Sequence, residues 1–221
     1  MPGEHPGEYI LLKQNGKDIA GLYELAGEMF EGVPSHWMSY VTVEDVDQAA
    51  EKAAKLDGNV LAPPMDIPGV GRMAFLQDPT GAQIAVFKPG EHVGTAEDGP
   101  FGWSELSTGD TAKAESFYTS LFGWGAKSDK GAPVAYTEFQ VGERSIAGMM
   151  ELDPKMAAAN VPPHWMPYVM VDDCDAISGK AAELGAQLLV PPTDIPDVGR
   201  FSVFMDPTGA SLAVIKLTAT A

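Results

Sequence analysis

The chain has 221 residues, of which 45% are hydrophobic and 20% are charged, and its formal net charge is −17. This length and composition are typical of soluble globular domains with sizeable cores, and no apolar run approaches the roughly 18–20 residues of a membrane span. Because so negative a charge repels phosphate backbones and anionic lipids, we exclude nucleic-acid-binding proteins and membrane-surface proteins as function classes.

The only cysteine is Cys174, which excludes an intramolecular disulfide and fits a reducing compartment. The first ten residues, MPGEHPGEYI, have neither a basic start nor an apolar stretch, so no signal peptide is visible. We therefore expect a cytoplasmic protein.

The first half of the chain shows strand-like runs and one helix. Two such runs, YILLKQ and IAGLYEL, are separated by the turn signal NGKD within 9–32. A strand pattern, HWMSYVTV, opens 36–88 and precedes an amphipathic helix that Asp45 or Asp47 can cap. Two strands follow, RMAFLQ and AQIAVFK, joined by the turn DPTG. The segment 90–100 has the composition of a linker.

The second half begins with a segment of a different kind. Within 101–152, the strand GWSELST precedes a helix capped near Thr108 or Asp110, with a buried stripe of Ala114, Phe117, Tyr118 and Leu121 and an end at Gly123. Two strands complete this stretch, and a third is an alternative around 132–136. The last stretch, 161–217, repeats the pattern of a strand, a helix and further strands.

The repetition is internal. Residues 33–89 recur at 161–217 with more than half of the paired positions identical, and 9–25 resembles 136–152. A repeat at fixed spacing indicates a duplicated domain. Residues 101–127 have no partner before Tyr9, so the first copy lacks its opening strand and helix. Each complete stretch of about 50 residues predicts an α+β unit with a helix on one face of a mixed sheet.

These motifs resemble a known family. FGWSELSTGDTAKAESFYTSLFGW, IAGMMEL and VPPHWMPYVMVDD, with PPTDIPDVGRFSVFMDPTGASLAV, are similar to two-domain members of the glyoxalase/bleomycin-resistance/dioxygenase (vicinal oxygen chelate) superfamily. The resemblance implies repeated βαβββ modules paired into two glyoxalase-like domains, at 1-89 and 101-221 with a linker at 90-100. The first domain lacks its opening βα, and either a neighbouring chain in a homodimer or a late start of the numbered chain is expected to account for that.

The resemblance also bears on cofactors. The family's metal-ligand positions fall on Met38, Trp103 and Met166 at the strand starts, and on Ala85 and Ala213 near the strand ends. These side chains offer no hard oxygen or nitrogen donor, so we expect no cofactor and no catalytic metal. A weak divalent-metal site at Glu105 and Glu151 is the disfavoured alternative. His36 and His164 each follow a proline and come just before a predicted strand. We expect both to form local hydrogen bonds at the start of their strands.

The same alignment predicts an apolar, aromatic pocket for a small organic molecule. Glu105 is the residue of this pocket with the clearest chemical role, as a general base or as an anchor for a cationic or hydroxylated ligand. A carboxylate beside Trp103 would be desolvated and its pKa raised. The alternative is a purely local hydrogen bond to the backbone or to a neighbouring tyrosine. The expected ligand-binding residues are Trp103, Ser107, Met149, Met166, Tyr168, Met170 and Ala213, with Met38 and Tyr40 in the first domain, and Arg200.

Arg200 and its counterpart Arg72 admit two interpretations. An ion pair with Asp194 or Asp66 would pin the Pro-rich segment to the strand, whereas the alternative is a carboxylate-binding arginine at the pocket mouth.

Three functions stay open from sequence. The first is a metal-independent protein that binds a small organic ligand. The second is a glyoxalase-like lyase, isomerase or dioxygenase-related enzyme. The third is an interaction or regulatory module that works through protein contacts.

Overall fold

The computed structural model describes residues 9–90, 100–129 and 135–218, arranged as two compact units. Unit 1 comprises Met1–Trp37, Gly94–Gly102 and Val169–Ala221, and unit 2 comprises Met38–Val93 and Trp103–Tyr168. Most of the predicted linker, 91–99, and the segment 130–134 lie outside the described residues. Each compact unit combines segments from both sides of that linker. The predicted domains 1-89 and 101-221 therefore differ from these units in their bounds and stay a prediction.

Unit 2 contains two modules of the same topology. The first consists of β3 (Tyr40–Thr42), α1 (Val46–Lys55), β4 (Asn59–Ile67), β5 (Gly71–Gln77) and β6 (Gln83–Pro89). The second consists of β7 (Trp103–Thr108), α2 (Thr111–Phe122), β8 (Gly125–Asp129), β9 (Tyr136–Val141) and β10 (Arg144–Glu151), followed by the short α3 (Pro154–Ala158). In each module the first strand pairs parallel with the last, and the last three strands are antiparallel neighbours. The predicted βαβββ pattern is therefore confirmed.

Strand β11 (His164–Met170) runs from unit 2 into unit 1. Its first five residues pair antiparallel with β7, so the strands of the second module in unit 2 follow the order β11-β7-β10-β9-β8. In unit 1, Val171 N–H donates to the Ile215 carbonyl, and α4 (Cys174–Glu183) is followed by β12 (Gln187–Ile195), β13 (Gly199–Met205) and β14 (Ser211–Leu217).

Unit 1 also contains the N-terminal hairpin. It consists of β1 (Ile10–Gln14) and β2 (Lys17–Leu22), which form a two-stranded sheet, followed by the 3-10 turn η1 (Glu28–Phe30). Asn15 and Gly16 have positive φ at its tip, as the NGKD turn signal predicts. In the described residues no strand corresponding to β7 and no helix corresponding to α2 accompanies this hairpin, consistent with the predicted lack of an opening βα.

Local sequence signals explain where the helices begin and end. Asp45 is the N-cap of α1 and Asp110 is the N-cap of α2, and each accepts a backbone N–H from the third residue after it, at 2.9 and 3.0 Å respectively. Gly123 ends α2 with a φ of 73°, a conformation that favours glycine. The predicted stripe of Ala114, Phe117, Tyr118 and Leu121 is buried.

Strand β8 was not predicted, and the alternative strand around 132–136 lies mostly outside the described residues. Strands β4 and β12 were not predicted either, because each contains a Pro-Pro pair that indicates a loop. In the structure β4 is the edge strand of the order β3-β6-β5-β4, and its register shifts between Ala62 and Met65, where the prolines lie. An edge strand tolerates proline because its outward N–H groups have no partner in the sheet.

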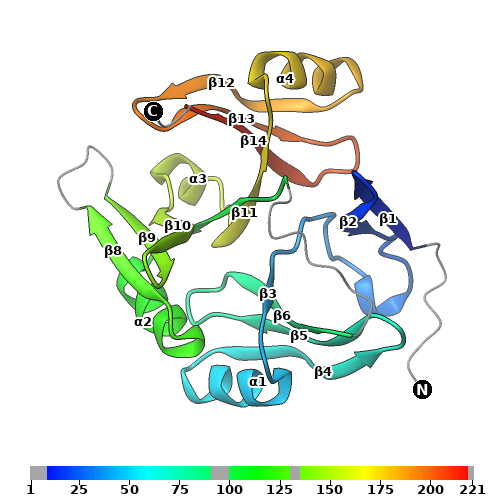
Figure 1. Ribbon diagram of the computed structural model, residues 1–221, viewed down its shortest axis with the longest axis vertical. Helices are drawn as coiled ribbons and strands as arrows, with labels where there is room; N and C mark the ends of the chain where they lie inside the picture. The colour runs from blue at the N-terminus through cyan, green and yellow to red at the C-terminus, as the bar shows by residue number, and fades with distance from the viewer. Residues whose placement is uncertain (1–8, 91–99, 130–134, 219–221) are drawn as a thin grey trace. The chain divides into compact units, whose positions relative to one another are not determined.

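One hydrophobic core joins the two modules of unit 2. Helix α1 lies along the β4–β5–β6 sheet (Figure 1), and the core continues from it to α2 and to the inner faces of β7, β9 and β10. Tyr118 is at its centre, with edge-to-face rings at 5.1 Å from Phe117 and 5.2 Å from Trp165. A smaller core in unit 1 gathers Cys174, Phe204 and Val214 under α4.

No helix within the described ranges is both long enough and apolar enough to cross a membrane.

Candidate functional site

Glu105 lies in the middle of β7, in the part of unit 2 where three strands meet. The register places it opposite Met166 of β11 on one side and opposite Gly148 of β10 on the other. Because side chains alternate along a strand, Trp103, Glu105 and Ser107 share one face, and Leu106 and Thr108 are buried in the core on the other. The predicted grouping of Trp103, Glu105 and Ser107 with Met166 and Tyr168 on one face is therefore found.

The carboxylate of Glu105 is held by two tyrosines. Tyr136 of β9 donates its hydroxyl hydrogen to Glu105 Oε2 at 2.9 Å, and Tyr168 of β11 donates to Oε1 at 3.1 Å. The indole Nε1–H of Trp103 donates in turn to the Tyr136 hydroxyl at 3.3 Å. This is the local tyrosine hydrogen bond that the sequence left open, and it places Tyr136 in the candidate site. Of these four residues, only Tyr136 was missed from sequence.

Gly148 makes the contact of Tyr136 with Glu105 possible. The Tyr136 ring lies across the strand at this glycine, so that an added Cβ would lie only 1.8 Å from the hydroxyl oxygen and 2.5 Å from the ring carbon that bears it. Any other residue at position 148 would therefore displace the ring. The same arrangement occurs in the N-terminal hairpin, where Tyr9 lies across Gly21. The repeated tyrosine and the repeated IAG of 9–25 and 136–152 were the signal that could have identified this pair.

Burial shapes the electrostatics of the site. Desolvation raises the pKa of Glu105, although the hydrogen bonds from Tyr136 and Tyr168 and the charge of His164 act in the opposite direction. Desolvation and the nearby carboxylate also raise the pKa values of Tyr136 and Tyr168. The two phenols are therefore hydrogen-bond donors rather than bases at neutral pH.

His164 is also on this face of the sheet. It is the first residue of β11 and pairs with Ser107. Its Nδ1 lies 2.9 Å from the carbonyl oxygen of Pro162, and His36 makes the same contact with Pro34 at 2.8 Å. The predicted local hydrogen bonds are confirmed, and the structure adds the electrostatic effect of His164 on Glu105.

Met149, which the sequence predicted as a ligand-binding residue, does not share the face of Glu105. It pairs with Leu106, is 1% exposed, and belongs to the core of unit 2. The prediction was wrong because the parallel register of β10 with β7 places Gly148 and Met150, not Met149, beside Glu105 and Ser107.

Tyr40 and Met38 belong to the other sheet of unit 2. Tyr40 pairs with Ala85 and makes edge-to-face contacts with Phe75 and Phe87, each at 6.3 Å between ring centroids. Met38 precedes β3 and is half-buried. Glu105 lies on β7, which belongs to a different sheet from β3.

Met170 and Ala213, two of the predicted ligand-binding residues, lie in unit 1. Met170 lines an open groove of about 1060 Å³ with residues of β1, β2, α4 and β14. Ala213 is fully buried and pairs with Val203. Their roles as ligand contacts stay predictions.

Arg200 is paired with two carboxylates. Its Nε and Nη2 donate to Asp175 of α4 at 2.7 and 2.9 Å, and its Nη1 donates to Asp194 of β12 at 2.9 Å. Hydrogen bonds from Arg200 lower the pKa of Asp175. The predicted ion pair is thus confirmed, and Arg200 is not free to bind a ligand as predicted, because its guanidinium is already bonded to two carboxylates. Arg72 repeats this arrangement with Asp47 and Asp66.

The side chains at the family's metal positions are poor ligands for a divalent metal. Trp103 and Met166 flank Glu105, and the carboxylate is already hydrogen-bonded by two tyrosines. Nowhere in the described part of the chain do three His, Cys, Asp or Glu side chains gather closely enough to hold a metal ion. Divalent-metal catalysis needs several convergent nitrogen or oxygen donors, so the residues here do not fit the metal that the family implies.

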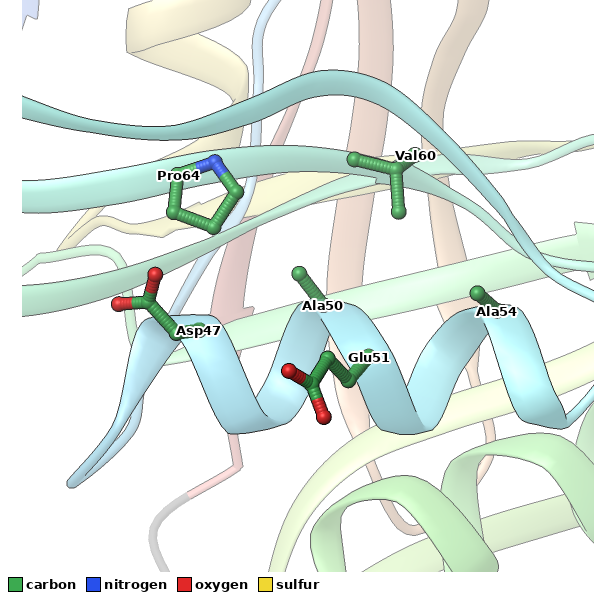
Figure 2. A pocket seen from close by; sticks show the side chains of 6 residues that line it. All are labelled: Asp47, Ala50, Glu51, Ala54, Val60 and Pro64. Carbon is green, nitrogen blue, oxygen red and sulfur yellow. The ribbon is translucent and has the colours of Figure 1, made fainter.

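A second groove lies in unit 2, away from Glu105. It has a volume of about 370 Å³ and lies between α1 and β4, lined by Asp47, Ala50, Glu51, Ala54, Val60 and Pro64 (Figure 2). It contains none of the predicted site residues, and its Asp47 is bound to Arg72.

Comparisons with known proteins agree with the fold. The family model of the "Glyoxalase/Bleomycin resistance protein/Dioxygenase superfamily" matches residues 3–86 and 100–214. The chain is 37% identical over 214 residues to the "Putative glyoxylase CFP32" of Mycobacterium tuberculosis, which covers 95% of this chain and 80% of that protein. It is 36% identical over 190 residues to the "Anthracycline biosynthesis protein DnrV" of Streptomyces peucetius, covering 84% and 67% respectively.

Two solved structures share the fold. One is a 2,2',3-trihydroxybiphenyl 1,2-dioxygenase from Sphingomonas wittichii, with a TM-score of 0.57 and 14% identity over 96% of this chain and 83% of that chain. The other is a Mn(II)-bound glyoxalase from Novosphingobium aromaticivorans, with a TM-score of 0.54 and 15% identity over 80% of this chain and 61% of that chain.

Proposed function

The chain belongs to the glyoxalase/bleomycin resistance protein/dioxygenase superfamily, and on that basis we propose that it binds a small organic molecule at Glu105 without a catalytic metal. The observation that carries the proposal is the Glu105 carboxylate held by Tyr136 and Tyr168 on a strand face that also presents Trp103 and Met166. Organic-ligand sites typically combine aromatic and apolar side chains with a few polar anchors.

The chemistry of the surrounding side chains supports an aromatic or partly aromatic ligand. Trp103, Tyr136 and Tyr168 offer flat π surfaces, and Met166 and Met150 offer polarizable thioethers on the same face. The name of the Streptomyces relative, an anthracycline biosynthesis protein, is consistent with a polycyclic aromatic ligand.

Metal independence is supported by the residues at the family's ligand positions. Met166 and Trp103 stand at the strand starts and Ala213 and Ala85 near the strand ends, and a thioether, an indole or a methyl group is a poor ligand for a hard divalent cation. We place this activity in the cytoplasm, where the buried thiol of Cys174 would stay reduced.

A ligand screen tests the proposal. Thermal unfolding of the wild-type protein is followed with a panel of aromatic small molecules, including an anthracycline, with and without EDTA. A ligand that binds only the folded state raises the unfolding temperature, and we expect the increase to survive EDTA. The increase should be lost in Glu105→Gln and kept in Glu143→Gln, which removes one exposed carboxylate from the β9–β10 turn. Stabilisation that vanishes with EDTA, or a panel without any stabilising ligand, would reject the proposal.

A glyoxalase-like lyase is the second candidate, favoured by the printed glyoxylase name of CFP32 at 37% identity. In that case Glu105 would be the general base, as its raised pKa permits. The test is turnover of methylglyoxal–thiol adducts, measured with and without added Mn²⁺, Ni²⁺ or Zn²⁺. Observed turnover would favour this enzymatic function over the proposed binding function.

An interaction role is the third candidate, favoured by the exposed side chains of the N-terminal hairpin. Tyr9, Ile10, Leu11 and Leu22 are each between 46% and 59% exposed. Light scattering that shows a homodimer, reduced to monomer by Leu11→Lys and Leu22→Lys, would support it.

A further inference from the structure

Glu105 has no ion-pair partner among the described residues, and His164 acts on it only electrostatically. Its two hydrogen-bond donors, Tyr136 and Tyr168, are neutral phenols, and none of the ion pairs found among the described residues includes it. A carboxylate removed from water without a counter-ion is energetically unfavourable, and proteins normally pair such groups. The two phenols satisfy one lone pair on each oxygen, so each oxygen can still accept another hydrogen bond.

The rings around this carboxylate favour a positive charge. The Trp103 indole is hydrogen-bonded to Tyr136, and Tyr136 and Tyr168 both reach the same carboxylate from opposite sides of β7. The faces of aromatic rings attract cations, Trp most strongly. An anionic ligand group would be repelled by Glu105 and would find no cationic partner in these contacts.

A second carboxylate lies on the same sheet. Gly148 pairs with Glu105 of β7 on one side and with Glu138 of β9 on the other, so both glutamates flank this glycine and the Tyr136 ring that crosses it. Glu138 accepts a hydrogen bond from Ser145 and is paired in register with Lys127 of β8. Glu138 is therefore a second carboxylate on this face of the sheet, and no described hydrogen bond joins it to Glu105.

From this arrangement we propose that the ligand is an organic cation, held by its protonated amine or quaternary ammonium group at Glu105 between the rings of Trp103, Tyr136 and Tyr168. This rests on the proposed function and narrows it to a ligand class. The ammonium group supplies the counter-ion that Glu105 lacks, and the apolar remainder of the ligand lies against Met166 and the rings.

Three probes of the same shape separate charge from hydrophobic contact: benzyltrimethylammonium, benzylamine and benzyl alcohol, with binding followed by ligand-observed NMR titration. We expect both cations to bind at least about tenfold more tightly than the alcohol, a difference of about 1.4 kcal/mol. Glu105→Gln should remove the preference while the alcohol binds as before, which also shows that the variant is folded. Glu143→Gln should behave as wild type.

The pH dependence gives a measurement that needs no variant. Benzyltrimethylammonium keeps its charge at every pH, so a loss of its binding on acidification reports on the protein alone. The groups that face Glu105 are His164 and Tyr168 of β11, and Tyr136 and Glu138 of β9, with Lys127 beside Glu138. Protonation of Glu105 removes the negative charge that would hold the cation, so its binding should weaken as the pH falls through the raised pKa of Glu105.

The outcomes are distinct. Benzyl alcohol that binds as tightly as the amines, with its binding lost in Glu105→Gln, overturns the cation inference and leaves the organic-ligand function in place. Binding of the cations to Glu105→Gln as tightly as to wild type overturns the assignment of the ammonium group to Glu105. If none of the three probes binds while other aromatic ligands stabilise the protein, the cation inference alone is overturned. If no ligand of any kind binds, both proposals are overturned.

Discussion

The hydroxyl of Tyr118 on α2 donates a hydrogen bond to Asp78 Oδ2 at 2.8 Å, which links the two modules of unit 2 through a buried polar contact. Asp78 is 1% exposed and opens the DPTG turn, where its Oδ1 accepts backbone N–H groups of that turn at 2.7–3.0 Å. Trp165 of β11 donates its indole N–H to the Tyr118 hydroxyl at 2.8 Å. Three distant stretches of sequence therefore meet at one phenol oxygen.

Replacing Tyr118 by Phe should destabilise the protein by about 3 kcal/mol, because the change leaves both the Asp78 carboxylate and the Trp165 N–H buried without their partner. Urea unfolding followed by tryptophan fluorescence measures this. Tyr136→Phe is the matched control, since it also removes a phenol bonded to a carboxylate but at a half-buried site, and should cost about 1 kcal/mol. Equal losses in the two variants would show that the Tyr118 network has no special weight.

Gly148→Ala should separate Tyr136 from Glu105. The new methyl group would occupy the position of the ring, so the phenol must rotate away and its raised pKa should fall towards the ordinary value. Ultraviolet absorbance during an alkaline titration detects this as earlier phenolate formation, and ligand stabilisation should be lost with it.

The N-terminal hairpin offers the control for that variant. Gly21→Ala displaces Tyr9 from the corresponding glycine, and both alanine variants should lose about 1–3 kcal/mol of stability from the crowding. Only Gly148→Ala should alter ligand binding. If Gly21→Ala abolished ligand binding to the same extent, general destabilisation rather than the position of Tyr136 would explain both.

Glu105→Gln should raise the unfolding temperature at neutral and alkaline pH. Burial raises the pKa of Glu105 above its ordinary value of 4.5, so the folded protein binds more protons than the unfolded chain between the two values. The stability of the wild-type protein therefore falls as the pH rises through the folded-state pKa, and the penalty of the ionised group is absent below the unfolded-state value. The amide avoids this penalty.

Thermal unfolding of wild type and Glu105→Gln between pH 4 and pH 8 checks the sign. The difference in unfolding temperature should be largest at pH 8 and should shrink towards pH 4, whereas Glu143→Gln should show no such trend. A Glu105→Gln variant that is less stable than wild type at pH 8 would mean that the tyrosine hydrogen bonds outweigh the desolvation.

Arg200→Ala and Arg72→Ala should each lower the unfolding temperature by only roughly 1–3 °C, because the carboxylates that they bind are mostly exposed to water. The effect should decrease in high salt, which screens exposed charges. Neither variant should change ligand binding. A loss of affinity in Arg200→Ala without a loss of stability would restore the alternative of a ligand-binding arginine.

Much of the fold follows from local signals in the sequence. Asp110 and Gly123 mark the ends of α2, the spacing of Ala114, Phe117 and Leu121 identifies its buried side, and the internal repeat gives the βαβββ unit. Strand alternation also places Trp103, Glu105 and Ser107 on one face, because the period of a strand is two residues whatever it pairs with. These features depend on neighbours in sequence.

The features that failed or were missed depend on partners far away in the chain. Met149 was predicted as a ligand-binding residue, but the register between β10 and β7 places Gly148, not Met149, beside Glu105. Arg200 was predicted as a ligand-binding residue because its second carboxylate partner could not be recognised from sequence. That partner, Asp175, lies on the helix that precedes the Pro-rich strand. The role of Gly148 could not be predicted from sequence, because it depends on the pairing of β9 with β10, which places the Tyr136 ring over this glycine.

The sequence by itself thus determined the family, the repeated module and the importance of Glu105 as a carboxylate among aromatic side chains. Only the tertiary structure decided that Tyr136 and Tyr168 bind this carboxylate, that no cation among the described ion pairs neutralises it, and that the two modules of unit 2 share a core around Tyr118. The physical reason is that helix and strand periodicity are set by local backbone geometry, whereas hydrogen bonds, charge pairing and desolvation are set by whichever residues the packed sheets bring together.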